Sequence, residues 1–132
     1  MDYWLPVEEE DVEHIQPIRS KKQFDQVLDV ISKKPEPFSN HFKSRKKNIH
    51  ERWKDGKLIS RAKLLRDLHG RLMLDKLNFS EKEMYETVKQ YFINEWIIAD
   101  EKLSKKMAIK RLTAVLRSSI SKVRTNNTYG ET

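Results

Sequence analysis

Hydrophobic residues recur at helical spacing in five segments of the chain. Spacings of three and four residues place such positions on one face of a helix. The pattern predicts helices that begin at Ser20, at Ser39 or Asn40, near Lys57, at Ser80 and at Ser104. We therefore expect an all-α fold, a compact bundle of about five helices preceded by a short extended arm.

Capping and helix-breaking residues mark the ends of these helices. Ser20 is a good N-cap for the first helix, which Pro35 prevents from continuing. Gly56 fits the C-terminal break of the second helix. Ser80 and Glu83 have the spacing of a capping box at the start of the fourth helix.

The fourth and fifth helices each have an apolar stripe. The fourth stripe consists of Met84, Val88, Tyr91, Phe92, Trp96 and Ala99. Because this stripe is wide, we expect the fourth helix to be the central one. The fifth helix has an apolar stripe of Met107, Ala108, Leu112, Val115 and Leu116, opposite a basic face of Lys105, Lys106, Lys110, Arg111 and Arg117.

The two ends of the chain lack a helical pattern. Residues 3–7, Tyr-Trp-Leu-Pro-Val, form a short apolar run that predicts a strand or extended arm, followed by an acidic linker. Residues 125–132 are polar and aperiodic, which is typical of a disordered tail. We therefore divide the chain into residues 1–18, a helical domain over 19–124, and a tail over 125–132.

Charge is distributed unevenly along the chain, whose net charge is +7. Residues 1–13 contain six acidic residues and no basic one, whereas residues 102–124 contain eight basic residues and no acidic one. Residues 43–57 contain seven basic residues against two acidic ones. Segregated basic charge favours a polyanionic partner such as nucleic acid, although an ordinary solvated surface accounts for it equally well.

Several kinds of chemistry lack a signature in this sequence. There is no cysteine, no pair among the four histidines has His-x-x-x-His spacing, and no glycine-rich phosphate loop occurs. No apolar run approaches the length of a membrane span. We therefore expect no enzymatic activity, no cofactor, no metal site and no membrane partner.

Phe42 begins the basic run of the second helix. Lys43 and Lys47 lie one turn apart on the same face, Lys46 lies beside them, and Arg45 points elsewhere. An exposed aromatic residue beside phosphate-binding lysines is the arrangement of a minor-groove wedge. Spacing alone favours an ordinary core position for Phe42, and the lysines also fit a solvated helix face.

Several stretches, in their order along the chain, resemble the C-terminal part of the CarD/CdnL family of bacterial RNA polymerase-binding transcription regulators. The stretches are residues 17–28 (PIRSKKQFDQVL), 33–37 (KKPEP), 56–57 (GK), 65–68 (LRDL) and 80–84 (SEKEM), and the resemblance covers about residues 3–116. It implies a five-helix DNA-binding domain. It further implies a cytoplasmic, nucleoid-associated protein, which we expect to be a monomer.

The resemblance implies roles for individual residues. The family wedge is a tryptophan in the minor groove, and Phe42 occupies the matching position. Trp53 matches an aliphatic core position. The resemblance implies DNA contacts for Phe42, Arg45, Lys46, Lys47 and Lys82, and the spacing of the basic run adds Lys43. The implied function is to bind double-stranded or fork promoter DNA at the upstream edge of the transcription bubble and to stabilise the open complex with RNA polymerase.

Two features leave alternatives open. Family members have an N-terminal domain that binds the polymerase β subunit, and residues 3–6 resemble its last strand, so we expect most of that domain to be missing from this sequence. The basic fifth helix differs from relatives, which are often acidic there, and is either a second phosphate-binding face or a local change in charge. The alternative function is a basic helical protein-interaction module without specific DNA binding.

Overall fold

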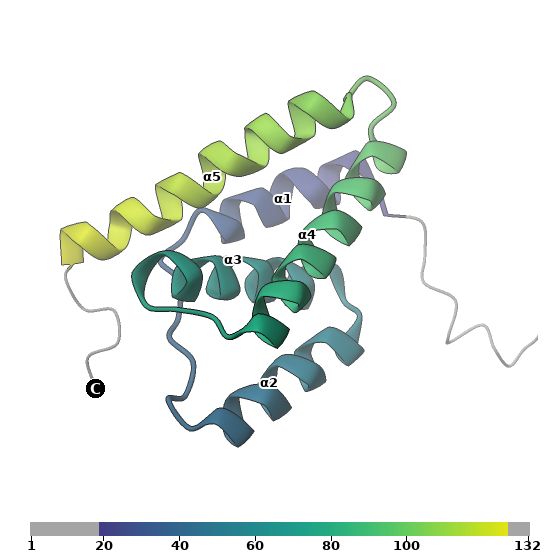
Figure 1. Ribbon diagram of the computed structural model, residues 1–132. Helices are drawn as coiled ribbons and strands as arrows, with labels where there is room; N and C mark the ends of the chain where they lie inside the picture. Colours follow the sequence, from purple (N-terminus) through teal and green to yellow (C-terminus); the bar gives the residue numbers. More distant parts are fainter. Residues whose placement is uncertain (1–18, 127–132) are drawn as a thin grey trace, which may run out of the picture.

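The computed structural model describes residues 19–126, which form five helices and, within that range, no strand (Figure 1). The helices are α1 (Lys21–Ile31), α2 (Phe42–Asp55), α3 (Leu58–Leu74), α4 (Phe79–Ala99) and α5 (Lys105–Asn126). The prediction of an all-α fold is confirmed. The predicted arm over residues 1–18 lies outside the described residues. The predicted tail lies outside them from residue 127 onward, while residues 125 and 126 belong to α5.

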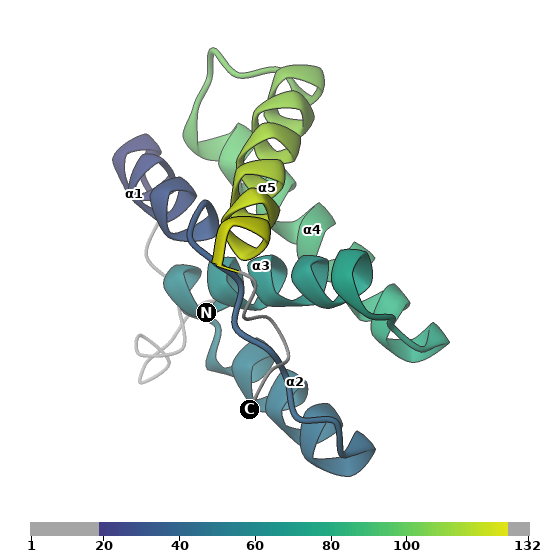
Figure 2. The same cartoon turned by 90° about the vertical axis from the view of Figure 1, so that its left-hand side faces the viewer.

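The central helix is α3, and the prediction that placed α4 at the centre is wrong. α3 packs against all four other helices, and α2 and α5 lie on opposite sides of it in both views (Figures 1 and 2). Its buried residues surround the helix: Ala62, Leu64, Leu65, Arg66, Asp67, Leu68, Gly70 and Arg71. Three of these residues are charged, and charged residues are read as exposed from sequence, so the pattern did not mark this helix as the central one.

Three aromatic rings join α1 to α4 in the core. Phe24 meets Phe92 edge-on with ring centroids 5.3 Å apart and is stacked with Trp96 at 6.3 Å. Arg111 of α5 covers the Trp96 ring, with its guanidinium carbon 5.0 Å from the ring centroid. Large rings in these geometries bury much apolar area and favour one packing arrangement.

The predicted N-caps of α1 and α5 are confirmed. The Ser20 hydroxyl accepts a hydrogen bond from the Gln23 backbone N–H at 3.2 Å, and the Ser104 hydroxyl accepts one from the Met107 N–H at 3.1 Å. Gly56 ends α2 in the left-handed region, at φ 72°, as predicted. Each of these residues ends or begins its helix through a local feature: a side-chain hydrogen bond to a free backbone N–H at the two serines, and a left-handed backbone at Gly56.

The predicted starts of α2 and α4 are wrong. α4 is capped by Asn78, whose side chain accepts from the Glu81 N–H at 2.8 Å, while the Glu81 carboxylate accepts from the Asn78 N–H at 3.1 Å. This capping box replaces the one predicted for Ser80 and Glu83. α2 begins at Phe42 and its N-cap, His41, makes no side-chain capping bond.

The buried face of α4 differs in part from the predicted stripe. Tyr85 and Ile93 are buried, whereas Tyr91 is half exposed. Tyr91 lies beside the core face and meets Trp53 of α2 edge-on, with ring centroids 5.3 Å apart. In α5, Met107 is likewise half exposed, although the predicted stripe included it.

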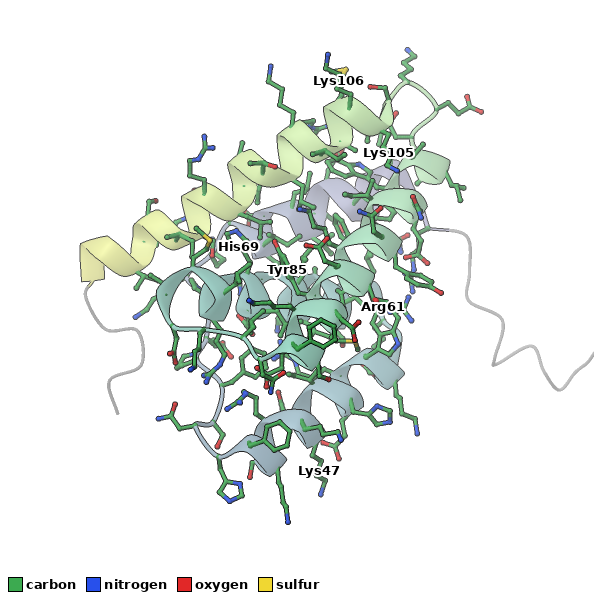
Figure 3. All side chains as sticks on the ribbon, in the orientation of Figure 1. Lys47, Arg61, His69, Tyr85, Lys105 and Lys106 are labelled. Atoms are coloured by element: carbon green, nitrogen blue, oxygen red, sulfur yellow. The ribbon has the colours of Figure 1, made fainter. Side chains whose placement is uncertain are left out.

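His69 of α3 is a partly buried imidazole that is kept neutral in the folded protein. Burial, with a smaller contribution from the charge of Lys89, lowers the pKa of His69 from 6.5 to about 4. The ring lies 5.9 Å from the Tyr85 ring, toward which it points in Figure 3. Its Nδ1 atom is buried and has no hydrogen-bond partner among the described residues.

We expect this histidine to make stability depend on pH. The unfolded chain protonates His69 near pH 6.5 and the folded chain only near pH 4, so its contribution is complete above pH 6.5 and is lost as the pH falls toward 4. Because the ring is only partly buried, we expect a loss on the order of 1–2 kcal/mol. Denaturant unfolding at several pH values should show a shallower acid loss for His69→Gln than for the wild type. Equal pH dependence of the two proteins would contradict this assignment.

Candidate nucleic-acid interface

Phe42 is the first residue of α2 and is 49% exposed. Spacing alone favoured a core position for this residue, and its exposure rules that out. The guanidinium carbon of Arg45 lies 5.8 Å from the centroid of the Phe42 ring, a cation–π contact that supports the ring from the side of the protein. The protein therefore presents an apolar ring to solvent at a defined position.

Three lysines follow Phe42 on the exposed part of α2. Lys43, Lys46 and Lys47 are all exposed, and their ammonium groups make no ion pair or hydrogen bond with any residue in the range 19–126. Lys47 points away from the bundle in Figure 3. The first turn of α2 contains no acidic residue, so the positive end of the helix dipole adds to these charges. Such a helix start favours phosphate groups.

Arg45 differs from the other predicted contact residues because it is buried, with an exposure of 7%. Its Nε donates to Glu81 at 2.5 Å, and its Nη1 donates to the backbone carbonyls of Ser39 and Asn40 at 3.1 and 3.4 Å. A guanidinium held in this way is not available at the surface. We assign Arg45 to holding the start of α2 and the preceding loop against α4.

Glu81 connects this support to Lys82. Glu81 is 5% exposed and both completes the capping box of α4 and pairs with Arg45. Lys82 follows it directly, is exposed, and its ammonium group makes no hydrogen bond or ion pair with a described residue. The ion pair therefore fixes the start of α2, with Phe42, relative to the start of α4, with Lys82.

A groove of about 570 Å³ lies between α2 and the first turns of α4. Its lining includes Phe42, Lys46, Ile49 and His50 from α2 and Ser80, Glu83 and Met84 from α4. Sequence reasoning missed this groove, because it exists only once α2 and α4 are packed together. It also gave no role to Phe79, the first residue of α4, which is 77% exposed. The only indication in the sequence was that Phe79 is an aromatic residue outside any predicted apolar stripe.

Trp53 anchors the other end of α2. It is partly buried and packs against the core, so the predicted core position is confirmed in part. Arg61 of α3, labelled in Figure 3, covers the Trp53 ring with its guanidinium carbon 4.1 Å from the centroid. With Arg45 at one end and Trp53 at the other, α2 is held along its length.

Other types of site find no support in the described part of the chain. Among residues 19–126, no group of three histidine, aspartate or glutamate side chains gathers in a way that could hold a metal ion. No helix in this range is both long and apolar enough to cross a bilayer.

Comparison with known proteins identifies one family. The family model described as CarD, C-terminal domain, matches residues 26–113, which include Phe42 and the lysines at 43, 46, 47 and 82. The search of curated proteins returned no match.

Proposed function

Because this chain belongs to the family of CarD C-terminal domains, a family of transcription regulators, we propose that it binds promoter DNA at the upstream edge of the transcription bubble. The observation that supports this proposal best is the exposed ring of Phe42 at the start of a basic helix. The chain has a transcription-related function as a family member; the DNA contact and its geometry are the proposal.

In this proposal Phe42 acts as an apolar wedge in the minor groove. Apolar side chains that enter the minor groove partly unstack a base step and kink the duplex. This costs least where the bases are already unpaired, as at the edge of a bubble. Phenylalanine has no N–H group on its ring, so it recognises the shape of the fork and not the edge of a particular base.

The lysines at 43, 46, 47 and 82 contact phosphates and set the position of the wedge. They have no acidic partners among the described residues, so phosphates displace only water and counterions from them. Release of counterions from four phosphates gives a slope of log K against log salt of about −3.6. With RNA polymerase present, a wedge held at the upstream fork would oppose closure of the bubble and so stabilise the open complex.

We expect Phe42→Ala to weaken binding to fork DNA by between about fivefold and about a hundredfold, the range for loss of a base–aromatic contact. Binding to fully paired duplex should change little, because the lysines remain. Fluorescence anisotropy with labelled fork and duplex promoter DNA at fixed salt measures both affinities. The melting temperature should hardly change, because the ring is half exposed.

Ile98→Ala is the matched control for this experiment. Ile98 is 76% exposed and lies near the C-terminal end of α4, away from the start where Lys82 lies. Its removal should leave both affinities unchanged. An unchanged preference of Phe42→Ala for fork over duplex would refute the wedge. Absence of fork binding by the wild type at low salt would favour the alternative of a protein-interaction module.

A further inference from the structure

The exposed side of α5 has a straight row of basic residues. Lys106, Lys110 and Arg117 are separated by four and seven residues, which places them within about 40° of one another around the helix axis. The row extends over about 16 Å, at 1.5 Å per residue. All three residues are exposed, and we refer to them as the α5 ridge.

The ridge residues make no hydrogen bond or ion pair that stabilises the described fold. Two other basic residues of α5 do have internal roles: Arg111 pairs with Asp25 at 3.8 Å, and Lys122 donates to the Ser32 carbonyl. The ridge side chains make no hydrogen bond or ion pair with any described residue, and residues 102–124 contain no acid that could neutralise them. Their positive charge is therefore available to an external partner.

The ridge lies on the opposite side of the molecule from α2. Figures 1 and 2 both show α3 between α5 and α2, and in Figure 3 Lys106 and Lys47 point away from opposite edges of the bundle. Two successive helix packings separate the axes of α5 and α2 by roughly 16–20 Å. A straight duplex on the α2 face consequently does not reach the ridge.

We propose that the α5 ridge binds the phosphate backbone of a second DNA segment, so that one domain bridges two segments. Lysine is depleted in protein–protein interfaces, whose centres favour aromatic anchors. Thr113 and Ala114, which lie along the row between Lys110 and Arg117, are small and exposed. Met107 and Ile109 are also exposed but lie to either side of the row, so the row itself offers charge without an apolar anchor. This combination favours a polyanionic backbone over an acidic protein. The bridging rests on the proposed function, because α2 must hold the first segment.

A capture experiment tests this proposal with the full chain. Fork promoter DNA is immobilised, the protein is added, and retention of a second, labelled plain duplex is measured at low salt. The wild type should retain the second duplex. The variant Lys106→Gln, Lys110→Gln, Arg117→Gln should still bind the fork and should retain less than about a tenth of the second duplex. The three substitutions remove up to three phosphate contacts, and such contacts supply nearly all of the affinity for plain duplex.

A variant with the same change in charge serves as the control. Lys22→Gln, Lys63→Gln, Lys76→Gln alters three exposed lysines that lie outside the ridge and outside α2, and it should retain the second duplex. Retention by the ridge variant equal to that of the wild type overturns the proposal. So does a wild-type protein that binds the immobilised fork but retains no second duplex.

Failure of the proposed function would look different. In the variant Lys43→Gln, Lys46→Gln, Lys47→Gln, plain duplex should still bind through the ridge, and adding the three ridge substitutions should abolish that binding. If substitutions at Phe42 and in α2 leave the affinity for fork DNA unchanged, but the ridge substitutions still weaken duplex binding, then the proposed wedge is refuted and the proposed ridge contact is supported. If the ridge substitutions leave the affinity for plain duplex unchanged, the proposed ridge contact is refuted, whatever the affinities for fork DNA are.

Discussion

Glu81→Ala is expected to lower the free energy of unfolding by about 3–5 kcal/mol, the cost of removing one partner of a buried ion pair. Arg45 would remain buried, at 7% exposure, with its charge no longer balanced. The same change removes the carboxylate that accepts from the Asn78 N–H at the start of α4. Denaturant unfolding followed by circular dichroism measures this loss.

Two further variants test whether the loss of stability comes from the broken ion pair and not from the removal of any acidic residue. Glu83→Ala removes an exposed carboxylate from the same turn and should change stability by less than about 0.5 kcal/mol. The double variant Arg45→Met, Glu81→Leu removes both charges and should recover most of the loss. If Glu81→Ala is no worse than Glu83→Ala, the pair does not have the stabilising role given to it.

The same ion pair shows why the site could be predicted only in part. The family resemblance implied a DNA contact for Phe42 and its lysines, and helical spacing indicated that Arg45 points elsewhere. It could not show that Arg45 is buried, because its partner Glu81 is 36 residues away in sequence. A charge on an amphipathic helix is read as exposed unless its partner is known.

The start of α4 illustrates a second limit of sequence reasoning. Asn78 with Glu81 and Ser80 with Glu83 have the same capping-box spacing, and asparagine and serine are similarly good N-caps. The structure has the box of Asn78 and Glu81, and the same Glu81 is buried against Arg45. Tertiary contact thus decides between two local signals of equal strength. Where no rival exists, as at Ser20 and Gly56, the local signal was sufficient.

The wedge of the proposed function depends on this support. Phe42 is exposed, so its position is set by the residues beneath it, chiefly Arg45 with its bonds to Glu81 and to the carbonyls before α2. A preorganised aromatic contact avoids the entropy cost of ordering a side chain on binding. A well-placed ring at the start of α2 is thus a consequence of an ion pair that does not itself reach the surface.

A second buried acid, Asp67 of α3, connects α3 to α2 and to the segment that follows α1. Asp67 is 1% exposed, and its Oδ1 accepts from the Arg66 Nε at 2.8 Å and from the Glu36 backbone N–H at 2.9 Å. Its Oδ2 accepts from the Arg52 Nη2 at 2.8 Å. Arg66 in turn donates to the Val30 carbonyl at 3.3 Å. One carboxylate therefore joins α2, α3 and the segment that follows α1.

We expect Asp67→Ala to destabilise the protein by about 3–5 kcal/mol, because it leaves the buried Arg66 without its closest ion-pair partner. Domains of this size have total stabilities of about 5–15 kcal/mol, so the loss is a large fraction of the whole. Asp67→Asn, which keeps acceptor oxygen but not the charge, should lose less. Asp29→Ala removes only an exposed pair with Lys33 and should cost at most about 0.5 kcal/mol. Equal losses for Asp67→Ala and Asp29→Ala in denaturant unfolding would show that the buried network contributes no more than a surface pair.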